Sequence, residues 1–172
     1  MYSILCDYIE SSWEPNMIMS GLEKGIDKRY SSWTKKDVSR LKRALNRKKF
    51  KNPRKRLLYR GGYHSPILEE ITKEEAMERF QRKESIMNLS PLSTSTSKEI
   101  AKEFGYLDKY LHILHVDTSV EIIDLKDIDC KGLDDNSQKA QIREKEILIA
   151  PKQRLIPYKK YGKHFHWIVK GK

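Results

Sequence analysis

Cysteine is scarce in this sequence of 172 residues, which contains only Cys6 and Cys130. These two residues are far apart, show no metal-ligand spacing and give no sign of a disulfide framework. We therefore expect a reducing compartment and a cytoplasmic location, in the protein's own cell or in the cytosol of a host cell.

Long apolar runs are absent as well. No stretch approaches the roughly 20 apolar residues that span a bilayer, and the N-terminal residues MYSILCDYIESSWEP lack the basic region and apolar run of a signal peptide. We expect a soluble protein without a membrane partner. The length fits a single domain over residues 1–172, with a mainly helical part at 1–52 and a mainly β part at 53–172.

Acidic residues are missing from residues 40–60, RLKRALNRKKFKNPRKRLLYR, which contain eleven Lys or Arg. The chain has 35 basic and 24 acidic residues and a formal net charge of +11, so this segment accounts for the whole excess of positive charge. Such a segment attracts nucleic acid, acidic protein or the phosphates of a nucleotide. A solvated helix face followed by a basic linker explains the pattern equally well.

The five histidines do not predict a metal site. His112 and His115 fall on opposite faces of a predicted strand, and His164 and His166 share a face without an evident third ligand. Both pairs are expected to be structural or solvent-facing, and no metal cofactor is predicted.

Helical patterns dominate the first part of the chain. Residues 17–30 carry apolar side chains roughly at helical spacing. A second helix is predicted after Thr34, where Asp37 and then an apolar stripe follow the N-terminal signal. A third is predicted after Thr72, where Glu75 completes the pattern of a capping box.

Strand patterns follow the helical ones. Segments rich in Ile, Leu, Val and aromatic residues predict strands at 56–60, 111–116, 120–125, 146–150, 154–158 and 164–169. Helices first and strands later predict an α+β fold rather than a βαβ alternation. The polar link at 126–145 is long, which is typical of a functional loop.

Five hydroxyl residues stand together at 93–97, directly ahead of a predicted helix. Thr96 can cap that helix, with Glu99 reaching back as a capping box, which leaves residues 93–95 unexplained. The preceding residues, LSPL, suggest a short strand, and a buried hydroxyl on such a strand needs a hydrogen-bond partner. A serine that holds another polar side chain explains the run, and so does a phosphorylatable linker.

Two further features stand on either side of this run. Arg60 ends an apolar strand at a Gly-Gly turn, where it carries a fixed charge to a place that a ligand can approach. Glu144 and Glu146 lie two residues apart as a long loop enters a strand, so both carboxylates share one face. Two carboxylates this close are unfavourable unless water solvates them or they serve a function such as catalysis or binding. Taken one at a time, a surface arginine and a solvent-facing strand edge are the plainer explanations.

The three features in this order resemble the mono-ADP-ribosyltransferases of the arginine–serine–glutamate class, which include binary-toxin enzymes, exoenzymes and phage and viral enzymes. LLYRGG is similar to the family's strand-borne arginine, PLSTSTSKEIAKEF to its Ser-Thr-Ser strand and helix, and REKEILIAPKQRLIPY to its Glu-x-Glu strand. The resemblance covers residues 30–160. It implies an α+β ADP-ribosyltransferase fold, with two antiparallel-rich sheets packed around an NAD cleft and N-terminal helices in front.

The resemblance also implies a role for each site residue. Glu146 is the implied catalytic acid beside the ribose and is held by Ser93, while Glu144 orients or deprotonates the acceptor. Arg60 binds the NAD phosphates, and the backbone at Gly61 faces the nicotinamide amide. The other implied NAD contacts are Thr94, Ser95, Tyr30 and Phe104, with Trp33, Tyr106 and Tyr110 as further aromatic candidates.

The implied function is the transfer of ADP-ribose from NAD to a protein side chain with release of nicotinamide, as in a toxin or effector. NAD glycohydrolysis is an expected side activity. An acid at Glu144 implies arginine as the modified residue, but residues 131–143 lack the aromatic that the family often has there, so threonine or another side chain stays open. An acidic acceptor protein fits the basic charge. The alternative is a basic nucleic-acid-binding protein that acts through residues 40–60.

Overall fold

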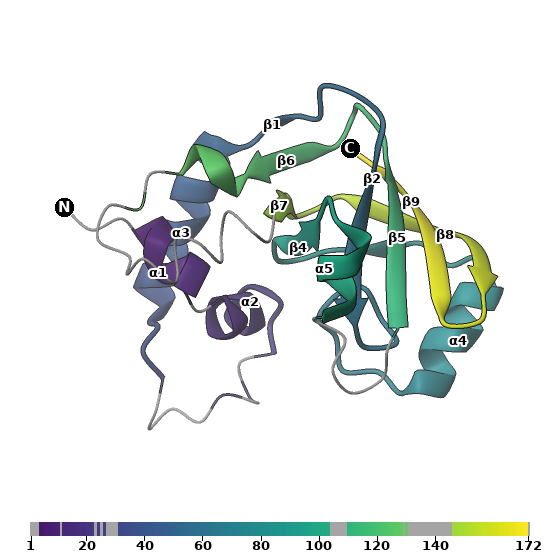
Figure 1. Ribbon diagram of the computed structural model, residues 1–172. Coiled ribbons are helices and arrows are strands. Elements are labelled where there is room, and N and C mark those ends of the chain that lie inside the picture. Colours follow the sequence, from purple (N-terminus) through teal and green to yellow (C-terminus); the bar gives the residue numbers. More distant parts are fainter. Residues whose placement is uncertain are drawn as a thin grey trace.

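The structure, a computed structural model, describes residues 4–10, 12–22, 24, 26, 31–103, 110–128, 130 and 146–171. The helices in these ranges are α1 (Ile4–Glu10), α2 (Trp13–Met19), α3 (Lys35–Lys48), α4 (Lys73–Gln81) and α5 (Lys98–Glu103), with the 3-10 turn η2 (Leu125–Asp127). The strands are β1 (Phe50–Lys51), β2 (Arg56–Gly62), β3 (Ile86–Met87), β4 (Leu92–Ser95), β5 (Tyr110–Val116), β6 (Glu121–Asp124), β7 (Glu146–Ile149), β8 (Arg154–Tyr161) and β9 (His164–Lys170). Figure 1 shows α1, α2 and α3 grouped on one side of the strands, whereas α5 packs against β2.

Helix α3 starts and packs as its sequence predicts. The Thr34 hydroxyl accepts a hydrogen bond from the Asp37 amide at 3.1 Å, and the Asp37 carboxylate accepts one from the Thr34 amide at 3.2 Å. This capping box satisfies two amides that the first turn of a helix leaves unpaired. The buried side chains Val38, Leu41 and Leu45 form the predicted stripe.

Helix α4 also begins at its predicted cap. The Thr72 hydroxyl accepts a hydrogen bond from the Glu75 amide at 3.1 Å, while the Glu75 carboxylate pairs with Arg79 one turn along the helix. The buried residues Ala76 and Phe80 lie on one face, with Met77 partly buried beside the core. The cap at Thr72 is therefore as predicted, but Glu75 does not complete the predicted capping box, because its carboxylate pairs with Arg79 instead.

The helix predicted over 17–30 is wrong in its extent. Helix α2 lies mostly before this range and ends at Met19. Gly21 then has φ +76°, its amide bonds to the Ile18 carbonyl at 3.2 Å, and the Leu22 amide bonds to the Met17 carbonyl at 2.9 Å. These bonds form a Schellman-type end, in which a glycine adopts the left-handed conformation and stops the helix.

In the described part of the chain, nine strands form one hydrogen-bonded sheet in the order β1-β6-β7-β4-β2-β5-β9-β8-β3. Strands β5 and β9 run parallel, and the other paired strands run antiparallel. One pair of residues, Tyr59 and Ser95, defines the register between β2 and β4 and joins the two halves of the sheet. The two expected sheets are therefore continuous at the point where β2 meets β4.

The two larger of three clusters of buried side chains in the described residues hold these layers together. One fills the space between the halves of the sheet and α4, with Leu58, Leu92, Leu114, Ile149 and Phe165 among its members. The other lies under α1 and α3, against the ends of β6 and β7. Burial of this apolar surface, which contributes roughly 25 cal/mol per Å², fixes the helices near the start of β7, where the candidate site lies.

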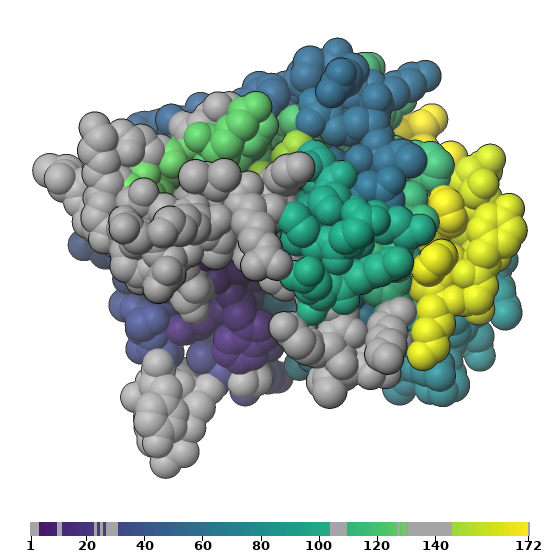
Figure 2. All heavy atoms as spheres, viewed as in Figure 1, coloured from purple at the N-terminus to yellow at the C-terminus, as the bar shows by residue number. Residues whose placement is uncertain are grey.

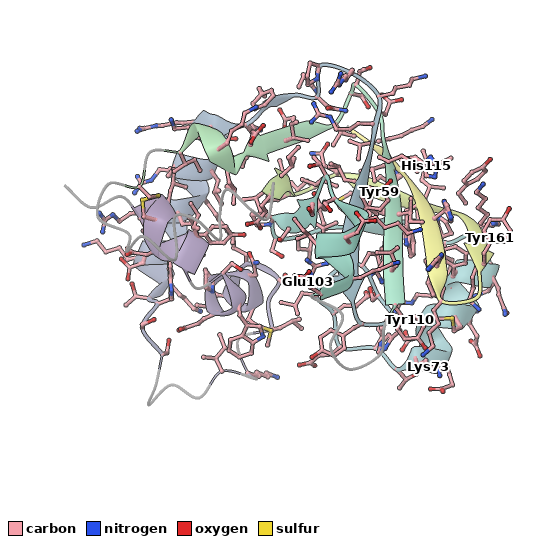
Figure 3. All side chains as sticks on the ribbon, viewed as in Figure 1. Tyr59, Lys73, Glu103, Tyr110, His115 and Tyr161 are labelled. Atoms are coloured by element: carbon pink, nitrogen blue, oxygen red, sulfur yellow. A yellow bond between two sulfur atoms is a disulfide. The ribbon has the colours of Figure 1, made fainter. Side chains whose placement is uncertain are left out.

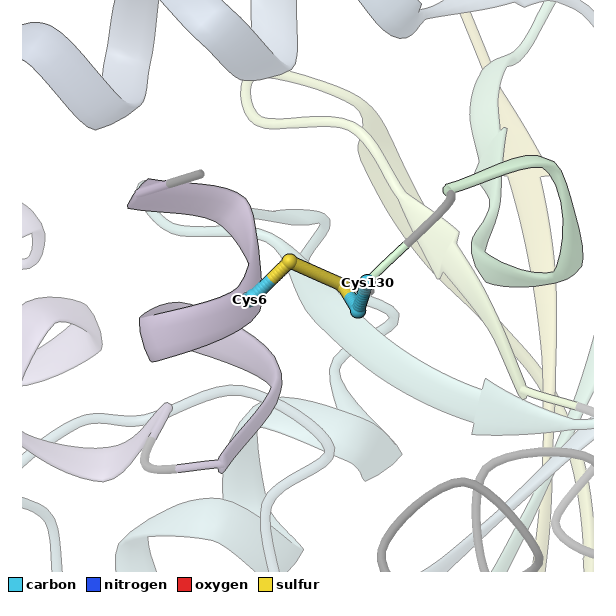
Figure 4. The surroundings of a disulfide bond; sticks show 2 residues. All are labelled: Cys6 and Cys130. Atoms are coloured by element: carbon cyan, nitrogen blue, oxygen red, sulfur yellow. A yellow bond between two sulfur atoms is a disulfide. The ribbon is translucent and has the colours of Figure 1, made fainter. Parts of the chain in front are cut away.

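Cys6 on α1 and Cys130 after η2 form a disulfide, with their Cα atoms 5.6 Å apart (Figure 4). The expectation that the cysteines do not form a disulfide framework is wrong. Both lie in the core cluster under α1 and α3, where Leu125 and Ile128 also pack. A sequence separation of 124 residues gives no sign of this contact, because only the folded core brings the two segments together.

None of the helices in the described residues is both long enough and apolar enough to cross a membrane.

Candidate active site

Arg60 lies near the end of β2, in register with His112 of β5. Its Nη1 atom donates a hydrogen bond to the Ser93 carbonyl of β4 at 2.9 Å, so the side chain reaches across the junction of the two sheet halves. Burial lowers the pKa of the Arg60 guanidinium, while the nearby negative charge of Glu146 raises it. Because an arginine stays protonated in proteins, this is a fixed positive charge beside a carboxylate.

Ser93 and Glu146 meet because of the register between β4 and β7. Ser95 pairs with Glu146 and Ser93 with Leu148, so Ser93 is a diagonal neighbour of Glu146 on the same face. The Ser93 hydroxyl donates a hydrogen bond to Oε1 of Glu146. Residue alternation along two antiparallel strands thus places one hydroxyl of the run against the carboxylate.

The other hydroxyls of the run have different partners. Thr94 is buried and its hydroxyl donates to the Ile147 carbonyl of β7. The Ser95 hydroxyl accepts a hydrogen bond from the Ser97 amide at 3.0 Å. Thr94 therefore ties the two strands together, and Ser95 shapes the turn into α5.

Ser97, and not Thr96, caps helix α5. The Ser97 hydroxyl accepts a hydrogen bond from the Ile100 amide at 3.4 Å and lies 3.1 Å from the Glu99 carboxylate. The cap expected at Thr96 is therefore misplaced by one residue. The cause is that Ser95 already closes the preceding turn, which shifts the start of the helix to Lys98.

The strand predicted to end at Arg60 in a Gly-Gly turn instead continues: Gly61 and Gly62 belong to β2 and pair with Leu111 and Tyr110 of β5, and the chain curves only from Tyr63. Gly62 has φ +143°, a conformation that side-chain-bearing residues rarely adopt. The exposed ring of Tyr63 lies at this curve, at the edge of the cleft. The Gly-Gly pair thus lets bare backbone, rather than a side chain, line the wall beside Arg60.

Buried His112 fixes the backbone at Tyr63 through a hydrogen bond. Trp167 Nε1, which can only donate, bonds to His112 Nδ1 at 3.1 Å, so the imidazole proton is on Nε2, which donates to the Tyr63 carbonyl at 2.7 Å. Burial lowers the pKa of His112 to about 4, although the bond to Tyr63 opposes the shift. His112 is therefore a neutral, fixed donor at neutral pH.

Tyr8 of α1 is a site residue that the sequence patterns did not single out. Its ring is buried, its hydroxyl donates to Asn16 Oδ1 at 3.1 Å, and it lines the cleft. Burial raises the pKa of Tyr8, and the opposing charges of Glu146 and Arg60 reach it. The helical spacing of Leu5 and Tyr8 was the available signal, since a short helix there would turn both inward.

A cleft of about 430 Å³ brings these groups together. Its walls come from α1 and α2 on one side, with Tyr8 and Trp13, and from β2, β4 and β7 on the other, with Arg60, Ser93 and Glu146. A second hollow of about 160 Å³ shares Trp13, Arg60 and Ser93 with the first. Arg60 therefore stands where the two hollows meet.

Several predicted residues are not in this cleft. Trp33 is buried in the core under α3, and Tyr110 is buried against Phe165, so neither offers a free ring there. The predicted residues Glu144, Tyr30 and Phe104, and the candidate Tyr106, lie outside the described residues. Within the described ranges, no group of three His, Cys, Asp or Glu side chains could hold a metal ion.

The basic segment 40–60 does not present one surface. Lys49 pairs with Glu121 at 2.8 Å, and Lys51 donates to the Ser119 carbonyl at 2.7 Å. Arg60 belongs to the cleft. The cations exposed along α3, such as Arg43 and Arg47, form the solvated helix face that the sequence also allowed.

No protein-family model and no curated protein sequence matches the chain. Solved structures match it in fold. BECa, an ADP-ribosylating toxin of a C. perfringens binary enterotoxin solved with NADH, has a TM-score of 0.63 and 15% identity over 96% of this chain and 42% of its own. C3larvin from Paenibacillus larvae has a TM-score of 0.59 and 16% identity over 97% and 92%. The ADP-ribosyltransferase Vis, solved with agmatine, has 0.56 and 15% over 97% and 71%.

These matches show that the chain has the ADP-ribosyltransferase fold, and the predicted α+β class is confirmed. Sequence identities of 15–16% are evidence for a shared fold and not for a shared activity. The chain spans less than half the length of BECa.

Proposed function

We propose that this chain, built on the ADP-ribosyltransferase fold, is an NAD-dependent mono-ADP-ribosyltransferase that modifies a protein side chain and releases nicotinamide. The observation that carries the proposal is the hydrogen bond from Ser93 to Glu146 inside the cleft that also contains Arg60. The reaction develops positive charge on the ribose, which a fixed carboxylate stabilises, and its substrate carries a negative diphosphate, which a fixed cation binds. Glu146 and Arg60 supply these two groups in one cleft.

Arg60 suits the diphosphate of NAD. Guanidinium groups bind phosphate oxygens through charge-assisted and often paired hydrogen bonds. Its place at the junction of the two hollows leaves space for one nucleoside on each side. Trp13 borders both hollows with 56% of its surface exposed, so its ring is available for stacking on a flat base.

Glu146 suits the ribose next to nicotinamide. In the reaction the bond from C1′ to the nicotinamide nitrogen breaks, nicotinamide leaves with the electron pair, and C1′ gains positive charge, as in glycoside hydrolysis. A carboxylate fixed in advance beside that charge lowers the barrier. The Ser93 hydroxyl fixes it, and the bare backbone at Gly61 leaves room for the nicotinamide amide.

The acceptor then forms a bond to C1′ and loses a proton. Glu144 is proposed to orient the acceptor or accept this proton, and a guanidinium acceptor would pair naturally with a carboxylate. The neighbour Vis was solved with agmatine, itself a guanidinium compound, which supports arginine as the modified side chain.

The test compares the wild type with Glu146→Gln, using labelled NAD with agmatine or a cell lysate. Nicotinamide release and label transfer should both fall about 10²–10³-fold, because a preorganised group of this kind supplies that much rate. Glu121→Gln is a matched control, since the Glu121 carboxylate lies on β6, pairs with Lys49 and does not line the cleft. Full activity in Glu146→Gln would show that the roles are wrongly assigned.

A second variant separates hydrolysis from transfer. Glu144→Gln should keep nicotinamide release and lose transfer to agmatine, because only the acceptor step uses this carboxylate. Mass spectrometry of the labelled proteins then identifies the modified residue. Label on threonine, with unchanged transfer in Glu144→Gln, would exclude arginine as the acceptor.

A further inference from the structure

A cluster of two exposed tyrosines, two half-buried histidines and a half-buried lysine lies on β5, β9 and β8, apart from the cleft. We call it the tyrosine–histidine patch, and its members are Tyr158, Lys159, Tyr161, His115 and His166. The ring of Tyr158 meets His115 edge-on at 5.7 Å, and that of Tyr161 meets His166 edge-on at 5.8 Å. His115 Nε2 and His166 Nδ1 are 3.1 Å apart. The Lys159 ammonium lies 5.3 Å from both tyrosine rings, which closes the cluster.

A bulge in β8 builds this patch. The register with β9 shifts between Pro157 and Lys159, so Tyr158 is the extra residue of the strand. Without the bulge, Tyr158 and Lys159 would alternate to opposite faces, whereas a bulge re-aims a side chain. The two tyrosines remain 48% and 63% exposed. The bulge therefore places an exposed aromatic ring on each side of Lys159 on this face of the sheet.

Along β8 and β9, which carry most of the patch, the charge is of one sign. Residues 151–172 contain seven Lys or Arg and no Asp or Glu. Among the described residues, Lys159 and Lys160 form no ion pair with a carboxylate. The β8 and β9 strands form the yellow right-hand side of the surface in Figure 2, next to α5, and Figure 3 labels His115 and Tyr161 there. A polyanion is therefore the complementary ligand.

We propose that the tyrosine–histidine patch binds single-stranded nucleic acid, with bases stacked on Tyr158 and Tyr161 and phosphates on Lys159 and its neighbours. Aromatic rings interleaved with cations form the usual surface for single strands, and sheet faces with exposed aromatics bind RNA in the same way. The cations alone would suffice to bind an acidic protein. Such a partner would give the two exposed tyrosines no role. The site goes beyond the transferase activity and needs no NAD.

The position of the patch suggests its use. Helix α5 packs on β2 and lies between the patch and the cleft (Figure 1). A nucleic acid held on β8 and β9 would bring proteins that are bound to it near Glu146. The patch would therefore recruit the enzyme to acceptors in nucleoprotein complexes.

The direct test is fluorescence anisotropy with a labelled single-stranded RNA of about 12 nucleotides, without NAD, at low salt. Tyr158→Ala/Tyr161→Ala should weaken binding about tenfold or more, because each stacked base contributes substantially to affinity. Tyr158→Phe/Tyr161→Phe keeps both rings and should bind within about threefold of the wild type. Equal binding by the alanine variant would overturn the proposal, and equal nicotinamide release by all three proteins would show that the fold is intact.

Salt dependence tests the charged part of the patch. Lys159→Gln should reduce the slope of log affinity against log salt by about 0.7, the value for one phosphate contact on a single strand. Arg47→Gln on α3 removes the same charge elsewhere and should leave the slope unchanged. If polyglutamate competes as well as RNA, or duplex binds as tightly as the single strand, the patch is a general acidic-protein or polyanion surface and the proposal is wrong.

Discussion

At the scale of single residues, the site depends on which partner each hydroxyl of the run takes. Ser93 bonds to Glu146, Thr94 to the backbone of β7, and Ser95 and Ser97 to the start of α5. Hydroxyls that look alike in the sequence therefore have unlike tasks. Ser93 is the hydroxyl that bonds to the Glu146 carboxylate.

Ser93→Ala should lower the kcat of nicotinamide release about 10- to 100-fold, since a hydrogen bond to a charged group contributes about 1.5–3 kcal/mol. Ser97→Ala is the matched control, because it removes only a helix cap. That variant should lose about 1 kcal/mol of stability and keep its kcat. Equal kcat values for the two variants would refute a positioning role for Ser93.

His112 predicts how stability depends on pH. Its pKa is about 4 in the folded protein, against an ordinary 6.5, because of its burial. As the pH falls below 6.5, the His112 imidazole becomes protonated in the unfolded chain, whereas in the folded protein it stays neutral until about pH 4. The unfolding free energy should therefore fall by about 3 kcal/mol across this window.

Denaturant titrations at several pH values measure this effect. His112→Gln should flatten the profile between pH 6.5 and 4.5, whereas His115→Gln, on the more exposed patch, should keep most of the slope. Carboxylates such as Glu14 and Asp37, whose pKa values are lowered, lose their contribution only at more acidic pH. A profile that is flat in the wild type would contradict the assignment of His112 as a buried neutral donor.

Candidate site residues are easier to find in a sequence when their immediate neighbours mark them. Arg60 and Glu146 are marked by their local context, a strand that ends at glycines and a strand that follows a polar loop. Tyr8 and His112 are not, because their importance comes from what packs around them in three dimensions. The same reason explains why Trp33 and Tyr110, attractive as free aromatics in the sequence, are buried in the core.

At the scale of elements, caps and periodicity predicted the starts of α3 and α4 and six strands, because these signals are local. Strands β1 and β3 have only two residues each, which is too short for any alternation to show. The pairing of β4 with both β2 and β7, on which the site depends, could not be read from the sequence. Register is a property of the assembled sheet, set by which faces become buried.

The disulfide between α1 and the segment after η2 predicts a large effect of reduction. It links residues separated by 124 positions, so breaking it should lower the unfolding free energy by about 2–5 kcal/mol. The Cys6→Ser/Cys130→Ser variant should show the lower value with or without dithiothreitol. Two titratable thiols in the unreduced, denatured protein would show that the bond does not form.

At the scale of the whole molecule, the active-site cleft and the tyrosine–histidine patch occupy different parts of one continuous sheet. The cleft lies where β2, β4 and β7 meet α1 and α2, and the patch lies on β5, β9 and β8 beyond α5. The sequence indicated the excess positive charge but placed all of it in residues 40–60. Folding spreads those cations over several surfaces and leaves a second, acid-free region at the C-terminal hairpin.

A crystal structure of the Glu146→Gln protein with NAD measures the central proposal directly, since this variant should bind the dinucleotide without cleaving it. We expect the diphosphate within hydrogen-bonding distance of the Arg60 guanidinium and the nicotinamide ribose beside residue 146. NAD bound elsewhere, or bound in the cleft with its ribose turned away from residue 146, would contradict the proposed chemistry.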